Sequence, residues 1–161
     1  MKGPIKSSFC GIETVSCVTG VAVDELYELV ECGNYLWVWN VSAGVGARRE
    51  LRFWCREINS PATVLNLTLN AAITAILPRR ARDAGRQDGL YYWEFRNFLR
   101  ISKSTLKGLR QELTPSGPEG NLFVPLTSLE DFFRRRWLGN ILIRNYALNP
   151  NLAPRLKKLC V

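Results

Sequence analysis

The stretch YYWEFRNFLRISKSTLKGLRQEL, residues 91–113, decides the fold. In its first half Phe95, Phe98 and Leu99 recur at three- and four-residue spacing, which places them on one face of a helix that turns about 100° per residue. Ile101 follows and is expected to fill the corner before a second helix. The outline is therefore a helix, a tight polar turn and another helix.

Ser102 is predicted to begin the second helix, because its side chain can accept a hydrogen bond from free backbone N–H groups of the first turn. Leu106, Leu109 and Leu113 continue the buried stripe. Gly108 costs the helix about 1 kcal/mol relative to alanine, and either close approach of a backbone or simple tolerance explains it. The side chains left exposed are Lys103, Ser104, Lys107, Arg110 and Gln111.

These exposed side chains are of the types that contact DNA. Polar residues and a cation near the start of a helix, with further cations one and two turns on, reach base edges and flanking phosphates in a major groove. The pattern predicts a helix-turn-helix whose second helix recognises DNA.

The segment RISKSTLKGL, residues 100–109, resembles the winged helix-turn-helix domains of the excisionase and MerR type. The likeness continues through TPSGPEGN, a loop too rich in proline and glycine to be helical, and LFVPLTSLEDFFRRRW. It covers roughly residues 91–138. In that family a short β-hairpin wing is followed by a helix, so the resemblance implies a wing over residues 114–121 and a helix after it.

The helix after the wing is expected to begin at Thr127 or Ser128, either of which can cap it. Three consecutive arginines, Arg134, Arg135 and Arg136, form its basic end. Its apolar stripe consists of Leu129, Phe132, Phe133 and Trp137.

A displacement of 80 residues aligns the chain with itself. Residues 20–33, GVAVDELYELVECG, fall on residues 100–113, and Leu26 then pairs with Leu106. Downstream, YLWVWNVSAGVG stands where the wing stands, and ARRELRFWCREI stands where the helix after the wing stands. The repeated apolar frame predicts two tandem winged units, with chance alignment of two helical hairpins as the alternative.

In the first unit we expect helices over residues 12–20 and 23–32, with Gly33 as C-cap. Residues 35–41 are apolar on both sides and predict a strand whose tryptophans pack in the core rather than face a partner. Residues 47–58 are expected to be helical. The second helix exposes Asp24, Glu25, Glu28 and Glu31. These carboxylates oppose phosphate binding, and they form either an ordinary solvated face or a docking face for a basic surface.

The predicted fold class is mainly α with short β-hairpin wings, in which tandem winged helix-turn-helix units are joined by an apolar helix. Residues 1–60 form the degenerate first unit, and residues 61–90 hold the central helix and a basic linker. Residues 91–140 form the DNA-binding unit, and residues 141–161 form a tail. The central helix, PATVLNLTLNAAITAILP, is expected between the two units or at a dimer seam.

The linker RRARDAGRQDG carries Arg79, Arg80 and Arg82 directly before the helix-turn-helix. Such an arm either follows the phosphate backbone or enters a minor groove, or it is simply a solvated linker. The charge of the chain is +8 in total and unevenly spread. Residues 1–62 hold six Lys or Arg against seven Asp or Glu, whereas residues 63–161 hold sixteen against seven. Only the second half therefore has the net positive charge that favours binding to a polyanion.

Several classes of function are excluded by composition. The chain has no histidine, which removes Ser-His-Asp and Cys-His catalysis and most catalytic zinc sites. Its five cysteines fit neither a disulfide framework nor a zinc site, and we expect reduced, mostly buried thiols. No segment is apolar enough to span a bilayer or to serve as a signal peptide, so we expect a cytoplasmic, nucleoid-associated protein without cofactor, metal or small-molecule ligand.

The predicted function is sequence-specific binding of double-stranded DNA without catalysis, as a transcription regulator or as an excisionase-like recombination directionality factor. The resemblance implies that the wing lies along the backbone or minor groove. A homodimer or cooperative oligomer on DNA stays open, and a protein-interaction adaptor of a larger nucleoprotein complex is the alternative function. The predicted DNA contacts are Arg100, Ser102, Lys103, Ser104, Thr105, Lys107, Arg110, Gln111, Arg134, Arg135, Arg136, Arg79, Arg80 and Arg82.

Overall fold

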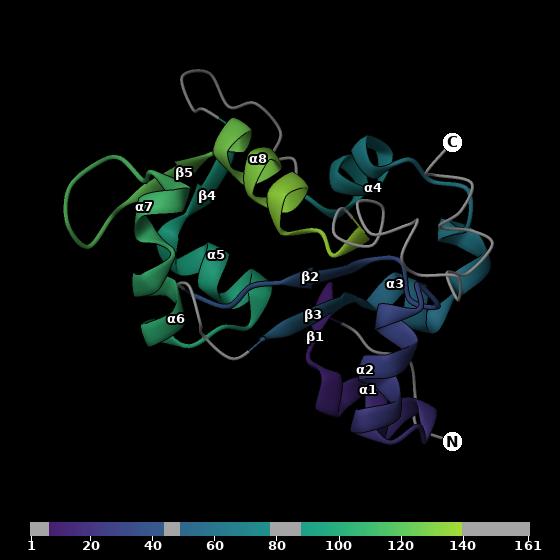
Figure 1. The fold of residues 1–161 in the computed structure, drawn as a ribbon. Helices are drawn as coiled ribbons and strands as arrows, with labels where there is room; N and C mark the ends of the chain where they lie inside the picture. The colour runs from purple at the N-terminus through teal and green to yellow at the C-terminus, as the bar shows by residue number, and fades with distance from the viewer. Residues whose placement is uncertain (1–6, 44–48, 78–87, 140–161) are drawn as a thin grey trace. The chain divides into compact units, whose positions relative to one another are not determined.

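The computed structural model describes residues 7–43, 49–77 and 88–139 (Figure 1). Within them the chain is a mixed α/β protein, about half helical, with eight α-helices and small antiparallel sheets. The described residues group into two compact units. The first contains residues 7–41, 49–66 and 136–139, and the second contains residues 42–43, 67–77 and 88–135. The predicted contacts Arg79, Arg80 and Arg82 and the tail lie outside the described residues.

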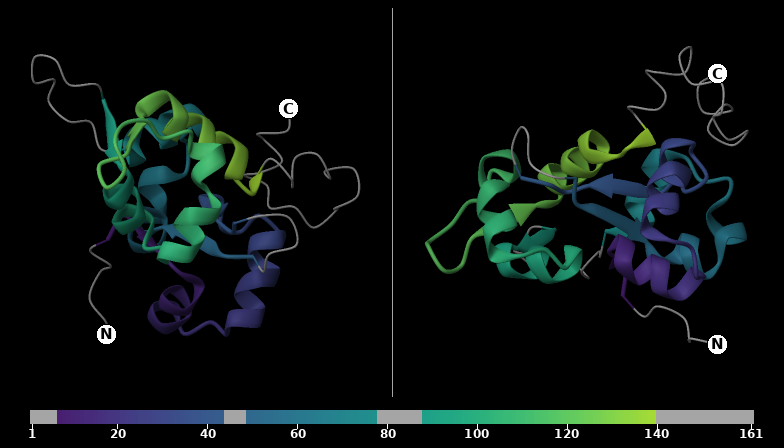
Figure 2. Two further views of the ribbon diagram at one scale, coloured as in Figure 1. Left: turned by 90° about the vertical axis from the view of Figure 1, so that its left-hand side faces the viewer. Right: turned by 60° about the horizontal axis from the view of Figure 1, so that its bottom comes forward.

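The first unit is built on a three-stranded antiparallel sheet in the order β1-β3-β2. In the register of its central strand, Phe53 pairs with both Cys10 and Val38. Helices α1 and α2 lie side by side in both sets of views (Figure 1, Figure 2). The elements are β1 (Phe9–Cys10), α1 (Ile12–Thr19), α2 (Val23–Glu31), β2 (Val38–Asn40), β3 (Leu51–Trp54), α3 (Cys55–Asn59) and the 3₁₀ helix η1 (Pro61–Val64).

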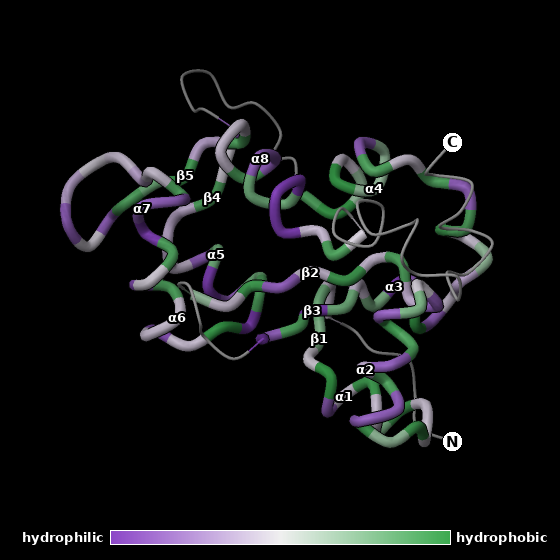
Figure 3. The backbone as a smooth tube through the Cα atoms, in the orientation of Figure 1, coloured by the Kyte–Doolittle hydropathy of each residue, from purple (hydrophilic) through white to green (hydrophobic). Residues whose placement is uncertain are grey.

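Helices α1 and α2 confirm the predicted helices to within one residue at each end. Gly33 has φ of 76° and ends α2: its N–H donates to the Val30 carbonyl at 3.0 Å, and the Asn34 N–H donates to the Leu29 carbonyl at 2.9 Å. These two bonds are the Schellman pattern, which needs a left-handed residue at this position. The predicted acidic face of α2 is exposed, and hydrophobic and hydrophilic residues alternate along the helix (Figure 3).

The tryptophans of the first unit form its core, as predicted. Trp37 and Trp39 have no exposed surface, and their rings stack at 6.3 Å between centroids. Trp37 also stacks on Trp137 at 5.7 Å. The Trp37 indole N–H donates to the Val64 carbonyl at 3.2 Å, and that of Trp137 donates to the Leu36 carbonyl at 2.8 Å. The buried indoles therefore keep their hydrogen bonds, which makes their burial favourable.

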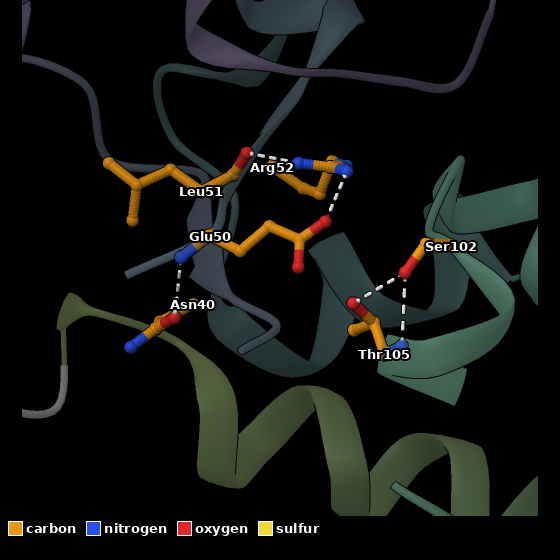
Figure 4. Close-up of polar contacts among 6 residues, drawn as sticks. All are labelled: Asn40, Glu50, Leu51, Arg52, Ser102 and Thr105. Atoms are coloured by element: carbon orange, nitrogen blue, oxygen red, sulfur yellow. Dashed lines mark hydrogen bonds and ion pairs between the residues drawn. The ribbon is translucent and has the colours of Figure 1, made fainter. Parts of the chain in front are cut away.

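The helix predicted over residues 47–58 is wrong in its first half. Residues 51–54 form β3, and the helical part is α3 alone. Leu51 and Phe53 are buried while Arg52 is half-buried, an alternation of period two that fits a strand with neighbours on both sides. Arg52 donates to the Glu50 carboxylate at 2.7 Å and to the Leu51 carbonyl at 2.9 Å (Figure 4), so this cation has local partners.

The single apolar helix predicted to join the units is also wrong. The segment folds as η1 in the first unit and α4 (Leu69–Ile76) in the second, with a break between them. The Thr68 hydroxyl accepts from the Ala71 N–H at 3.2 Å and begins α4, because a capping hydroxyl favours a new helix start over continuation. Leu65 is 49 % exposed, whereas Ala72, Ile73 and Ile76 of α4 are buried, so the segment is not buried along its whole length.

The second unit pairs β4 with β5 as an antiparallel ribbon, with Tyr91 opposite Phe123. Its core packs the face of α5 against α8, where Phe95 meets Phe132 edge to face at 5.4 Å. Besides α4, its elements are β4 (Gly89–Tyr91), α5 (Tyr92–Leu99), α6 (Lys103–Gly108), α7 (Arg110–Leu113), β5 (Phe123–Pro125) and α8 (Leu126–Arg136), whose last residue groups with the first unit.

Helix α8 has the predicted apolar stripe but not the predicted start. Neither Thr127 nor Ser128 caps it, because the helix begins at Leu126 directly after β5. The Leu126 N–H donates to the Asp88 carbonyl at 2.9 Å, so the strand ladder satisfies a donor that a cap would otherwise serve. Leu129, Phe132 and Phe133 of this stripe are buried in α8, whereas Trp137 follows the helix and stacks on Trp37 in the first unit.

The cysteines agree only partly with the expectation that their thiols are mostly buried. Cys10 and Cys55 are buried, Cys32 is half-buried and Cys17 is exposed, and all four are free thiols.

No helix among residues 7–43, 49–77 and 88–139 is long and apolar enough to cross a membrane.

Candidate nucleic-acid interface

The turn between α5 and α6 is built on a residue in an unusual conformation. Arg100 ends α5 with φ of 55° and ψ of 45°, the left-handed region that favours glycine. The Ile101 N–H donates back to the Arg96 carbonyl at 3.2 Å, and the buried Ile101 fills the corner as predicted. The chain therefore reverses sharply within one residue and leaves the Arg100 side chain exposed.

We expect Arg100→Gly to raise the free energy of unfolding of the second unit by about 1 kcal/mol, because glycine adopts the left-handed region without the Cβ clash. The same change removes a cation from the predicted DNA contacts and should weaken duplex binding. Chemical unfolding and titration with duplex measure the two effects. Arg100→Lys is the control, since it keeps both the charge and the backbone penalty; an Arg100→Gly variant no more stable than Arg100→Lys would contradict the expectation.

Ser102 caps α6 as the sequence predicts. Its Oγ accepts a hydrogen bond from the Thr105 N–H at 3.0 Å and donates to the Thr105 hydroxyl at 3.0 Å (Figure 4). The helix is interrupted once, because Leu109 (φ −89°, ψ −4°) separates α6 from α7. The predicted second helix is thus two short helices in series.

The buried face of these helices confirms the predicted stripe. Leu106, Leu109 and Leu113 are each less than 7 % exposed. The Tyr92 hydroxyl donates to the Leu106 carbonyl at 2.7 Å, which joins α5 to α6 across the turn. Burial raises the pKa of the Tyr92 phenol, and the nearby Arg110 opposes that rise. The packing fixes which face of α6 points to solvent.

The solvent face of α6 and α7 carries the predicted polar and basic residues. Ser102, Lys103, Ser104, Lys107, Arg110 and Gln111 are exposed, and Thr105 is half-buried. Lys103 and Lys107 are one helical turn apart and have no ion pair within the described part of the chain. Two ammonium groups on one face are therefore available to an anion.

Gly108 is explained by close approach rather than by tolerance. A Cβ at this position would overlap the Cβ of Ala43, which groups with the second unit. The neighbour is a side chain and not the backbone that the sequence suggested. Glycine is therefore needed at the end of α6 despite its cost to the helix.

The segment expected to be the wing is a compact loop over residues 114–122. Ser116 and Phe123 exchange backbone hydrogen bonds at 2.9 and 2.8 Å and close its base. Gly117 and Gly120 have φ of 106° and 86°, and the Asn121 N–H donates to the Pro118 carbonyl at 3.0 Å. The only charged residue of the loop is Glu119, which binds Arg110 at 2.5 Å.

The three consecutive arginines of α8 do not form one cationic patch, because successive side chains on a helix diverge by about 100°. Arg134 donates to the Asn70 side chain at 3.2 Å. Arg135 donates to Glu112 at 3.3 Å. Arg136 donates to the Asn40 carbonyl at 3.3 Å, in the first unit. Each guanidinium thus already has an intramolecular partner, a fact that the run of charges could not reveal.

The net positive charge does not lie in the described residues. They contain eleven Lys or Arg against thirteen Asp or Glu, a net charge of −2. Residues 1–6, 44–48, 78–87 and 140–161 contain eleven against one, a net charge of +10. The excess of positive charge in the sequence, the feature that attracts polyanions at long range, therefore belongs to these other segments.

The described residues hold no cluster of three or more His, Cys, Asp or Glu side chains that could bind a metal ion. Comparisons with protein-family models, with curated proteins and with solved structures find no significant match.

Proposed function

We propose that the protein binds double-stranded DNA sequence-specifically, without catalysis, by placing α6 in the major groove. The observation that carries this proposal is the one-sided construction of α6. Its inner face is buried leucine, and its outer face presents Lys103, Ser104 and Lys107 on a helix start capped by Ser102. Lysine and serine at the exposed start of a helix are suited to phosphates and base edges.

The order of elements supports a winged helix-turn-helix of the excisionase or MerR type for the second unit. A strand, two helices across a tight turn, a short further helix, a closed loop, a strand and a helix follow one another as β4, α5, α6, α7, the loop 114–122, β5 and α8. The first unit has the similar order β1, α1, α2, β2, β3 and α3. We therefore propose tandem winged units, of which only the second recognises DNA.

The acidic face of α2 supports this division of labour. Helix α2 of the first unit corresponds in order to α6, yet its exposed residues are carboxylates that phosphates would repel.

The proposed cellular role is a transcription regulator or a recombination directionality factor acting on DNA in the cytoplasm. Arg79, Arg80 and Arg82 belong to the proposed contacts as a basic arm.

Selection of bound duplexes from a random pool tests this function directly. We expect one preferred site, and half-sites spaced by about one helical turn if two protomers bind symmetrically. With about six phosphates contacted, log K should fall with log salt at a slope near −5. A bound pool that stays random, or a protein that ignores duplexes at low ionic strength, would refute the proposal.

One observation favours a second candidate, a protein-interaction adaptor. Trp93 is 57 % exposed and stacks on Tyr91 with centroids 6.5 Å apart and planes 6° apart. An exposed tryptophan whose ring is held by stacking on a neighbouring aromatic ring is typical of protein–protein interfaces. The same selection separates the two candidates, because an adaptor would enrich no sequence.

A further inference from the structure

The ion pair between α7 and the loop 114–122 connects two parts of the proposed interface. Arg110 begins α7, one turn beyond Lys107, and its Nη2 binds Oε1 of Glu119 at 2.5 Å. The hydrogen bond to Glu119 is the largest cause of a raised pKa for Arg110, so the guanidinium stays charged. Both side chains are exposed, at 48 % for Arg110 and 77 % for Glu119.

The loop holds Glu119 at a defined place. Gly117 and Gly120 take positive φ on either side of it, and the bond from Asn121 to Pro118 closes the turn around it. The paired backbone bonds of Ser116 and Phe123 anchor the loop to β5. The backbone that carries Glu119 is therefore held in place, and the hydrogen bond from Arg110 orients the carboxylate.

The pair leaves most of the guanidinium available. Glu119 occupies one Nη2 hydrogen, and among the described residues Arg110 has no other hydrogen-bond partner. Nη2 has two hydrogens, one parallel to Nε–H and one parallel to an Nη1 hydrogen, so the one that Glu119 leaves free still forms with its neighbour the planar fork that binds O6 and N7 of guanine. A guanidinium already held by a carboxylate also loses less side-chain freedom when it binds.

We propose that Arg110 reads a guanine in the major groove and that Glu119 is the positioning residue that orients it. The inference rests on the proposed DNA-binding function. It also explains why the loop has a carboxylate as its only charge, since an isolated acid beside phosphates would oppose binding, whereas an acid paired with Arg110 is neutralised.

The test measures binding to the selected site and to duplexes in which each base pair is replaced in turn. We expect the wild type to prefer G·C at one position by about tenfold. Glu119→Gln should lose most of that preference while binding unrelated duplex equally well or better. Arg110→Ala should lose the same preference, and adding Glu119→Gln to it should cause no further loss.

Glu112→Gln is the matched control, because it removes the same charge from another Arg–Glu pair of the second unit, with Arg135. It should leave the preference intact. Chemical unfolding of Glu119→Gln should match wild type, since exposed pairs contribute little to stability. Unchanged preference in Glu119→Gln would overturn this inference alone, whereas a wild type without any sequence preference would overturn the proposed function and this inference together.

Discussion

Glu57→Ala is expected to lower the free energy of unfolding of the first unit by about 3 kcal/mol. Glu57 is only 5 % exposed, and its Oε1 accepts the Leu36 N–H at 2.7 Å. Its Oε2 accepts the Trp37 N–H at 3.3 Å. Alanine would leave two buried backbone donors without acceptors, and each such donor costs about 1–3 kcal/mol.

The position of these donors makes the loss large. Leu36 and Trp37 lead directly into β2, where the buried indole rings form the core of the first unit. Water cannot replace the carboxylate without opening that core. The Tyr35 phenol lies in the same environment, and burial, followed by the negative charge of Glu57, raises its pKa. The carboxylate is therefore a structural acceptor of the first unit.

Urea unfolding followed by tryptophan fluorescence measures this effect, because Trp37, Trp39, Trp54 and Trp137 all belong to the first unit. Glu57→Gln keeps one acceptor oxygen and should lose about half as much stability. Glu31→Ala is the control: it breaks an exposed pair with Arg49 at 3.3 Å and should change stability by less than about 0.5 kcal/mol. A Glu57→Ala variant as stable as this control would show that the carboxylate is dispensable.

The parts of the fold that the sequence predicted well depend on local interactions. The turn from α5 to α6 is specified by apolar spacing, by Ile101 and by the hydroxyl of Ser102, all within one short stretch. The ends of α1 and α2 are specified in the same way, since Gly20 and Gly33 supply positive φ at their C-termini. Signals of this kind act over four or five residues, so the sequence displays them directly.

The predictions that failed depended on contacts between distant residues. Residues 51–54 have a pattern compatible with a helix or a strand, and pairing with β1 and β2 decides for the strand. The sequence predicted one helix after Ser60 because the segment is apolar throughout. Thr68 instead caps a new helix and divides the segment in two. Neither the pairing of β3 nor the break before α4 can be predicted from the spacing of apolar residues alone.

The candidate interface shows the same limit. Exposure of Lys103 and Lys107 follows from the spacing of the leucines beside them, and the structure confirms it. The partners of Arg110 and Arg135 are carboxylates on other elements, at separations of 9 and 23 residues, which no local pattern indicates. Sequence therefore predicted which side chains are exposed better than which cations are already paired.

The double variant Lys103→Glu, Lys107→Glu is expected to lose about a hundredfold in affinity for the selected duplex, or about tenfold for each lost contact. Both side chains are exposed on one face of α6 and make no ion pair in the described part of the chain, so the fold should not change. If each lysine neutralises one phosphate, the slope of log K against log salt should become shallower by about 1.8.

The control must separate local contact from total charge, because most of the net charge lies outside the described residues. Arg49→Glu with Arg56→Glu changes the net charge by the same amount on exposed cations of the first unit. If α6 enters the groove, this control should lose several-fold less affinity than the lysine variant and should keep the wild-type base preference. Equal losses in the two variants would mean that attraction by overall charge, rather than contact by α6, accounts for binding, and α6 would then not be the recognition element.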